Sequence, residues 1–253
     1  MPEAGSVVRV AAVGDIHCGK NSAGQVRPLF DRAEDFADVL VLCGDLTDYG
    51  LPEEAHLLVT ELADVLGKLP VVAVLGNHDF ESGREAEVAR ILVDAGVHLL
   101  DGDSIELEGV GFAGVRGFGG GFGRGTLGTW GEKPVKAFVQ EAIDEAMKLE
   151  SALARLRTDG KIAVLHYAPI RATVENEPPE IFPFLGSGRL EEPLNRYPVT
   201  AAVHGHAHNG THAGRTTAGV PVYNVSLPLM RRTLPDRPPF LILEVPVGAG
   251  PAT

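Results

Sequence analysis

Three short aliphatic runs in the first third of the chain each close with a glycine turn. They cover residues 7–13, 39–42 and 71–75, and they lead into Gly14-Asp15, Gly44-Asp45 and Gly76-Asn77. Runs of this length without polar alternation are typical of parallel strands that are covered on both faces. The pattern therefore predicts three buried parallel strands.

Helical patterns separate the strands. Pro52 and two glutamates open a first turn, an apolar face follows at helical spacing, and the pattern stops at Gly67. Residues 84–95 behave similarly, with Gly96 in the stop position. The resulting β-α-β-α-β order predicts an α/β layer, in which sites lie at the carboxyl ends of strands.

The second half of the chain predicts more strands and one long helix. We expect the helix at 138–156, with one charged face, and strands in the ranges 97–107, 110–115, 162–165, 201–203, 220–225 and 240–245. No repeat or linker divides the sequence, so we expect one domain over 1–253, with a frayed tail at 248–253.

Composition excludes some functions. A net charge of −12 argues against an extended nucleic-acid surface, and 6% aromatic residues argue against a base-stacking platform. We see no signal peptide, no disulfide framework in two cysteines, and no apolar run near the ~20 residues that cross a membrane. We expect a cytoplasmic protein that does not insert into membranes; its oligomeric state is open.

Metal-binding residue types recur at the strand ends. Eight side chains stand there in five short segments: Asp15, His17, Asp45, Asn77, His78, His166, His206 and His208. Mixed nitrogen and oxygen ligands suit Mn, Fe, Zn or Co better than Ca or Mg. Each segment alone is typical of an ordinary turn or a satisfied polar residue, but five in order indicate a two-metal centre with one histidine to spare.

These segments resemble the ordered motifs of the calcineurin-like metallophosphoesterase superfamily: Asp-x-His, Gly-Asp, Gly-Asn-His-Asp, His and Gly-His-x-His. The resemblance runs from Asp15 to His208 and fills every motif position. It implies a four-layer α-β-β-α sandwich, in which two mixed β-sheets flanked by helices place the site at one edge.

The resemblance also implies roles for these residues. Asp15, His17 and His208 would hold one divalent cation and Asn77, His166 and His206 a second, with Asp45 bridging them. A hydroxide shared by the two cations would attack phosphorus, and His78 would act as general acid or stabilise charge. Asp79 either orients His78 or acts as a turn residue that bonds its own backbone.

The sequence indicates the type of reaction more clearly than it indicates the subgroup of the superfamily. The stretch Gly44-Asp45-Leu46-Thr47-Asp48 is most like the small bacterial cyclic-nucleotide phosphodiesterase type, whereas His166-Tyr167-Ala168-Pro169 matches that type only loosely. We expect a small phosphate mono- or diester as substrate. One alternative is a non-catalytic, metal-bound interaction scaffold. The other is a nuclease, which the net negative charge of the chain disfavours.

Two further features stay open. The glycine-rich stretch 117–125, with Arg116, Arg124 and Trp130 around it, is either a lid over the site or a flexible surface loop. Cys18 follows His17 and is either an extra ligand or, as we favour, a buried reduced residue.

Overall fold

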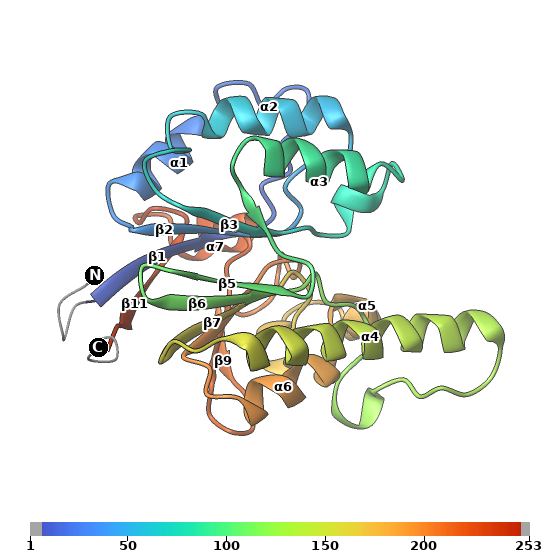
Figure 1. Ribbon diagram of the computed structural model, residues 1–253. Helices are drawn as coiled ribbons and strands as arrows, with labels where there is room; N and C mark the ends of the chain where they lie inside the picture. Colours follow the sequence, from blue (N-terminus) through green and yellow to red (C-terminus); the bar gives the residue numbers. More distant parts are fainter. Residues whose placement is uncertain (1–6, 249–253) are drawn as a thin grey trace.

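Two mixed sheets form the centre of the molecule, which a computed structural model describes for residues 7–248 (Figure 1). The first sheet has the order β11-β1-β2-β3-β4, and only β11 runs antiparallel to its neighbour. Its strands are β1 (Val7–Val13), β2 (Val39–Cys43), β3 (Val71–Val74), β4 (His98–Leu99) and β11 (Leu241–Pro246). The three predicted parallel strands are confirmed.

The second sheet has the order β5-β6-β7-β8-β10-β9, with antiparallel pairs at both ends and parallel pairs between them. Its strands are β5 (Asp103–Leu107), β6 (Val110–Gly114), β7 (Gly160–Val164), β8 (Ala201–His204), β9 (Ala213–Arg215) and β10 (Pro221–Asn224). The carboxyl ends of its parallel strands β7 and β8 carry His166 and the 204–208 segment.

Alternation along each strand divides its side chains between two cores. In β1, Val8, Val10 and Ala12 pack against the second sheet, whereas Ala11 and Val13 face the helices on the outer side. Phe112 and Ile162 of the second sheet complete the core between the sheets, and both are fully buried. Because both faces of the central strands β2, β3, β6, β7 and β8 are covered, their continuous apolar runs follow directly from the architecture.

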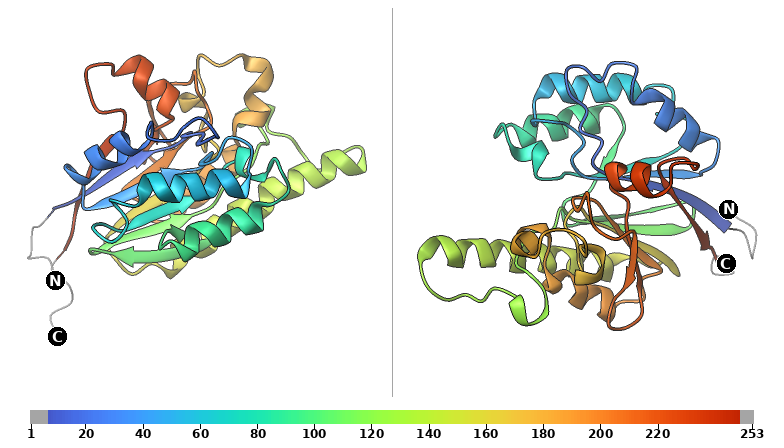
Figure 2. Two further views of the ribbon diagram at one scale, coloured as in Figure 1. Left: turned by 90° about the horizontal axis from the view of Figure 1, so that it is seen from above. Right: turned by 180° about the vertical axis from the view of Figure 1, so that it is seen from behind.

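Helices form the two outer layers. The first sheet is covered by α1 (Arg27–Glu34), α2 (Pro52–Leu62) and α3 (Glu85–Asp94), as the view from above shows (Figure 2). The second sheet is covered by α4 (Lys133–Arg155) and α6 (Glu191–Arg196). Two further helices, α5 (Phe182–Leu185) and α7 (Leu227–Thr233), lie in the later loops. The predicted four-layer α-β-β-α sandwich is confirmed.

Some elements differ from the sequence pattern. The expected strand at 97–107 is two strands, because Gly102 has a left-handed φ of 78° and turns the chain between β4 and β5. The helix expected at 138–156 begins earlier, at Lys133, and its first turns project beyond the body (Figure 1). The expected tail at 248–253 lies outside the described residues, except Gly248.

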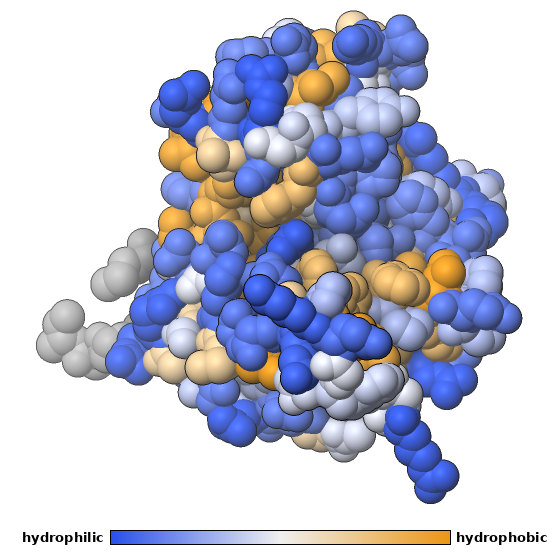
Figure 3. Space-filling view, turned by 90° about the vertical axis from the view of Figure 1, so that its right-hand side faces the viewer, coloured by the Kyte–Doolittle hydropathy of each residue, from blue (hydrophilic) through white to orange (hydrophobic). Residues whose placement is uncertain are grey.

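The glycine-rich stretch is held by backbone pairing rather than by regular structure. Gly121 bridges to Ser187, and Gly120 donates to the carbonyl of Pro183, so the stretch lies against the segment around α5. It contains one turn of 3-10 helix at Gly123–Gly125. Figure 3 shows the side of the molecule on which α4 projects: its surface is mostly hydrophilic, with hydrophobic residues gathered near mid-height.

Candidate metal centre

The predicted ligand residues meet at the carboxyl ends of β1, β2, β3, β7 and β8. Three groups of side chains lie close enough to share a cation: Asp15, His17 and His208; Asp45, His166 and His206; and His17, Asp48 and His78. Seven of the eight predicted side chains belong to these groups, and Asn77 contacts the second group through His166.

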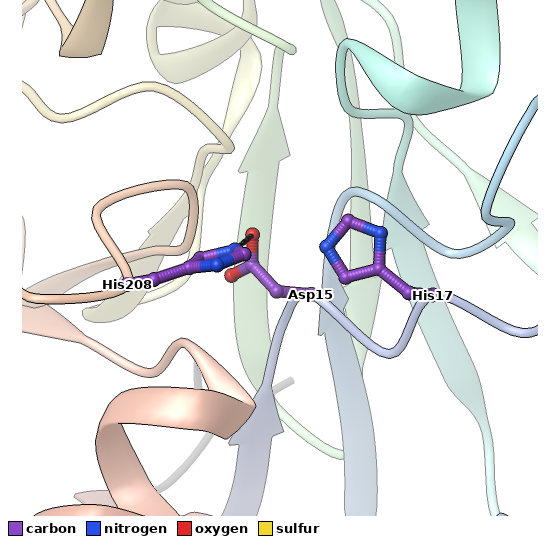
Figure 4. Close-up of side chains that lie close together, drawn as sticks. All are labelled: Asp15, His17 and His208. Carbon is purple, nitrogen blue, oxygen red and sulfur yellow. Dashed lines mark hydrogen bonds and ion pairs between the residues drawn. The ribbon is translucent and has the colours of Figure 1, made fainter.

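Asp15 and His208 form the innermost contact of the first group (Figure 4). Nε2 of His208 lies 3.0 Å from Oδ1 of Asp15, and the backbone N–H of His206 donates to the same carboxylate at 2.9 Å. Burial alone would raise the pKa of Asp15, but the His208 hydrogen bond and the nearby imidazoles outweigh it and bring the pKa to about 2. Asp15 is therefore a carboxylate at neutral pH.

Asp45 lies between the first two groups. Its Oδ2 is 3.8 Å from Nε2 of His17, and its Oδ1 is 3.3 Å from Nε2 of His166. The side chain is almost fully buried, and burial together with Asp15 raises its pKa. The two oxygens of one carboxylate thus face imidazoles from the two different groups.

The second group is built around His166, which is fully buried. Its Nδ1 donates to the carbonyl of Cys43 at 3.0 Å, and its Nε2 lies 2.8 Å from Oδ1 of Asn77. His206 uses Nε2 to donate to the carbonyl of Phe184 at 3.1 Å. Burial lowers the pKa of His166, and burial lowers that of His206 to about 4, so both imidazoles are neutral at pH 7.

These contacts leave electron pairs facing one another. Because neutral His166 carries its single proton on Nδ1, its Nε2 presents a lone pair toward the carboxylate oxygen of Asp45. Nε2 of His17 is buried with no hydrogen-bond partner among residues 7–248, although Asp45 is near. Lone pairs converging on one another suit a cation, so the donor set fits divalent metal ions.

The backbone at these positions is strained. Asp15, His17, Asp45 and His206 have φ values of 57°, 47°, 47° and 68°, in the left-handed region that residues with a side chain rarely adopt. Such conformations cost free energy and persist where the surroundings fix them, most often at functional sites. The turns therefore aim these side chains at the cluster at some cost in stability.

Two glycines allow the loops to approach. A Cβ at Gly76 would lie 2.2 Å from both the backbone nitrogen and Oδ1 of Asp45, and a Cβ at Gly44 would lie 2.6 Å from Nδ1 of His166. No side chain fits in either place. The Gly-Asp and Gly-Asn motifs thus reflect close packing of ligand loops against one another.

His78 lies beside the cluster and is partly exposed. Its ring is 4.6 Å from that of His17, and its Nδ1 donates to the backbone carbonyl of Asp48 at 2.7 Å. Burial would lower its pKa, but the Asp48 hydrogen bond and the Asp45 carboxylate outweigh burial and raise it. Nε2 makes no hydrogen bond with any residue that the structure describes.

Asp79 does not orient His78. Its buried carboxylate accepts from the N–H groups of Leu46, Thr47 and Gly76, and from the hydroxyl of Thr47. The expected orienting contact is wrong, because the side chain points into the loop that carries Asp45. The alternative expectation, a turn residue that bonds its own backbone, matches only the bond from Gly76; the other three bonds come from Leu46 and Thr47.

The structure adds Asp48 to the candidate residues. Its Oδ1 lies 3.7 Å from Nδ1 of His17, and its carbonyl fixes His78. The sequence signal that could have identified Asp48 is its position, three residues after Asp45. Cys18 stays outside every group of candidate ligands found in 7–248; it is buried, and burial raises its pKa to about 12.

The glycine-rich stretch borders a separate cavity of about 590 Å³, which Arg124, Arg171 and Phe182 also line. Trp130 is exposed and stacks on no aromatic ring in the described part of the chain. Neither feature touches the candidate ligands, so the lid expectation has no support. Among the described helices, none is both long and apolar enough to span a bilayer.

Comparisons with known structures agree with the fold. Phosphopantetheinyl hydrolase from Mycobacterium tuberculosis aligns over 94% of this chain and 96% of its own, with a TM-score of 0.65 and 16% identity. A structure described as a 5′-nucleotidase from Staphylococcus aureus, in complex with alpha-ketoglutarate, covers 87% of this chain and 48% of its own, with a TM-score of 0.54 and 16% identity. At these identities the likeness shows the fold alone.

Sequence comparison gives the family. An uncharacterized protein of Methanocaldococcus jannaschii is 33% identical over 72 residues, which are 28% of this chain and 29% of that protein. The match thus spans less than a third of that relative. The family model for calcineurin-like phosphoesterases matches residues 8–210, which include every predicted ligand. The chain therefore belongs to the calcineurin-like phosphoesterase family.

Proposed function

We propose that this protein hydrolyses a small phosphate mono- or diester at a centre of two divalent cations. The observation that carries this proposal is the position of Asp45, whose two carboxylate oxygens face His17 and His166 separately. Asp15, His17 and His208 would hold one cation, and Asn77, His166 and His206 the other. Since these ligands come from both sheets, we also propose that 1–253 functions as one domain.

The chain prepares the ligands before any cation binds. The carbonyls of Cys43 and Phe184 fix the tautomers of His166 and His206, so each ring directs its other nitrogen toward the cluster. When bound, divalent cations supply Lewis acidity, which activates water near neutral pH and neutralises charge on the phosphoryl group. Mn, Fe, Zn and Co all suit this mixture of imidazole, carboxylate and amide ligands.

His78 would protonate the leaving oxygen or stabilise its charge. The Asp48 carbonyl accepts only, so Nδ1 of His78 holds a proton and Nε2 is the atom available to a substrate. A non-catalytic scaffold would not need an imidazole held in this way. The proposed role therefore distinguishes an enzyme that uses the centre from a protein that only binds metal.

A metal-loaded activity screen tests the proposal. Protein stripped with a chelator would be reloaded with Mn, Fe, Zn or Co, and assayed against phosphate monoesters, cyclic nucleotides and linear diesters. A phosphopantetheine ester belongs in the panel because of the name of the structural neighbour. We expect two metals per chain and hydrolysis that disappears on stripping. Metal binding without turnover of any ester would favour the scaffold, and one metal at full activity would exclude the shared centre.

A further inference from the structure

The backbone of Arg116 lies directly beside the candidate centre. Its backbone carbonyl accepts hydrogen bonds from the N–H groups of both His166 and Tyr167, each at 3.0 Å. The arginine follows β6, so it belongs to the second sheet, whereas its guanidinium reaches the 3-10 turn of the first sheet that begins at His78. It therefore spans the two halves of the sandwich next to the cluster.

The guanidinium of Arg116 is fixed in place. Its central carbon lies 4.4 Å from the ring centre of Phe80 and 5.4 Å from that of Phe118, and one terminal nitrogen donates to Glu141 at 2.8 Å. Stacking on aromatic rings and a single ion pair remove its rotational freedom. The other N–H groups of the guanidinium make no hydrogen bond within residues 7–248, and they are accessible to solvent.

A second free donor lies nearby. The ring of Tyr167 packs 4.5 Å from His206 and 5.4 Å from His166, measured between ring centres. Its hydroxyl makes no hydrogen bond with any described residue. The described polar atoms that are both buried and without a partner do not include it, so the hydroxyl is accessible to solvent. Most of the ring is buried, so the hydroxyl is the part of this side chain that can meet a ligand.

We propose that Arg116 and the hydroxyl of Tyr167 bind the oxygens of the phosphoryl group that is hydrolysed. This inference rests on the proposed function and names a recognition site for its substrate. A planar guanidinium and a phenol hydroxyl are donors that match phosphate oxygens.

The position of Glu141 limits what Arg116 recognises. Because one terminal nitrogen is already paired, the guanidinium cannot present its full double fork, and one edge is left for the substrate. Arg116 thus provides one directed contact, with Tyr167 as a second donor on the side of His206. This pairing suits a single phosphoryl group.

Binding of inorganic phosphate, measured by titration calorimetry on metal-loaded protein, tests the site directly. Arg116→Lys keeps the charge but loses the planar donor, and Tyr167→Phe removes only a hydroxyl that makes no hydrogen bond within residues 7–248. We expect each to weaken phosphate binding, by about tenfold or more for Arg116→Lys. Arg196→Lys and Tyr197→Phe are matched controls: Arg196 also pairs with a glutamate of α4, Glu150, and both residues lie at α6.

Steady-state kinetics with esters of different leaving groups complete the test. We expect kcat/KM to fall by the same factor for every ester, in proportion to the loss of phosphate affinity. Unchanged phosphate affinity in both variants overturns the inference, as does a loss confined to one leaving group. If the parent hydrolyses no ester, the proposed function fails, but the phosphate titration still decides on the anion site. If Arg116→Lys lowers the unfolding temperature, Tyr167→Phe carries the decision.

Discussion

Nδ1 of His78 lies 2.7 Å from the backbone carbonyl oxygen of Asp48, in the turn that also carries Asp45. A carbonyl cannot donate, so this contact fixes the tautomer and turns Nε2 away from the protein. The ring lies 4.6 Å from that of His17, a proposed ligand. A backbone atom, rather than a carboxylate, thus orients this histidine.

Replacing His78 should separate chemistry from metal binding. We expect His78→Ala to keep the metal content of the parent, because the proposed ligands are all elsewhere. Loss of a general acid should lower kcat by about 10²–10⁴-fold. Metal content and hydrolysis of phosphodiesters with poor and good leaving groups would be measured on the same sample, and the large loss is expected for the poor ones. A smaller loss for an ester with a very good leaving group would support the acid role, and unchanged turnover would contradict it.

Replacing Asp45 should lower the metal content, unlike replacing His78. Asp45→Asn removes the charge that faces His17 and His166 together, and one amide cannot offer two equivalent oxygens. We expect the protein to bind fewer than two metals per chain and to lose hydrolysis with them. Full retention of both ions in Asp45→Asn, measured by elemental analysis after dialysis, would refute the bridging assignment.

Asp79 should matter for folding more directly than for catalysis. Its carboxylate accepts four hydrogen bonds from Leu46, Thr47 and Gly76, so Asp79→Asn leaves some of these buried donors unpaired. We expect a loss of about 1–3 kcal/mol in the free energy of unfolding. Chemical denaturation would measure it. A variant of parental stability with a selective loss of turnover would instead restore a role for Asp79 at His78.

Gly76 tests how tightly the ligand loops pack. A Cβ there would overlap the backbone of Asp45, which is buried and cannot move aside, so we expect Gly76→Ala to lose metal binding and stability. Gly125→Ala is the control, since Gly125 has no neighbouring atom within 4 Å of an added Cβ and no left-handed φ. Equal metal affinity in the two variants would show that the loops can separate without consequence.

Glu61 should make stability depend on pH. Its carboxylate accepts the N–H groups of Gly24, Val26 and Arg27 at the start of α1. Burial opposes this effect, but those hydrogen bonds lower the pKa of Glu61 below its usual 4.5. The unfolded chain therefore takes up the proton first, so the contribution is complete above pH 4.5 and is lost as pH falls through the lowered pKa.

Glu61→Gln isolates that contribution. We expect the variant to be less stable than the parent at pH 7, by about 1 kcal/mol, because it lacks the charge at a helix N-terminus. The difference should shrink in unfolding experiments carried out progressively below pH 4.5. A difference that stays constant down to low pH would mean that the charge of Glu61 does not contribute.

Sequence patterns predicted the buried strands and their glycine ends because both follow from local chemistry. A strand covered on two faces needs an aliphatic run, and a loop that approaches another loop needs glycine. The same patterns missed α1, a helix of only eight residues, although Leu29, Phe30 and Ala33 form a buried face on it. They also joined β4 to β5, since a left-handed Gly102 is not distinguishable by sequence from a glycine inside a strand.

The sequence predicted which residues belong to the candidate centre better than it predicted the contacts between them. Residue type and order indicated which side chains could bind metal. Whether Asp48 or Asp79 contacts His78 depends on the directions in which the turns point these residues, and residue type and spacing do not give those directions. The sequence pointed to Arg116 only as a neighbour of the glycine-rich stretch, because only the pairing of β6 with β7 places the arginine carbonyl against the histidine strand end.

The contact between Asp15 and His208 joins positions 193 residues apart and links the ends of strands from different sheets. A cation held by both would act as a non-covalent cross-link that closes most of the chain into a loop. Such a closure reduces the entropy of the unfolded chain, and it must open before the sheets can part. Metal loading should therefore slow unfolding at this edge of the sandwich, and the opposite edge would become the place where the two sheets begin to separate.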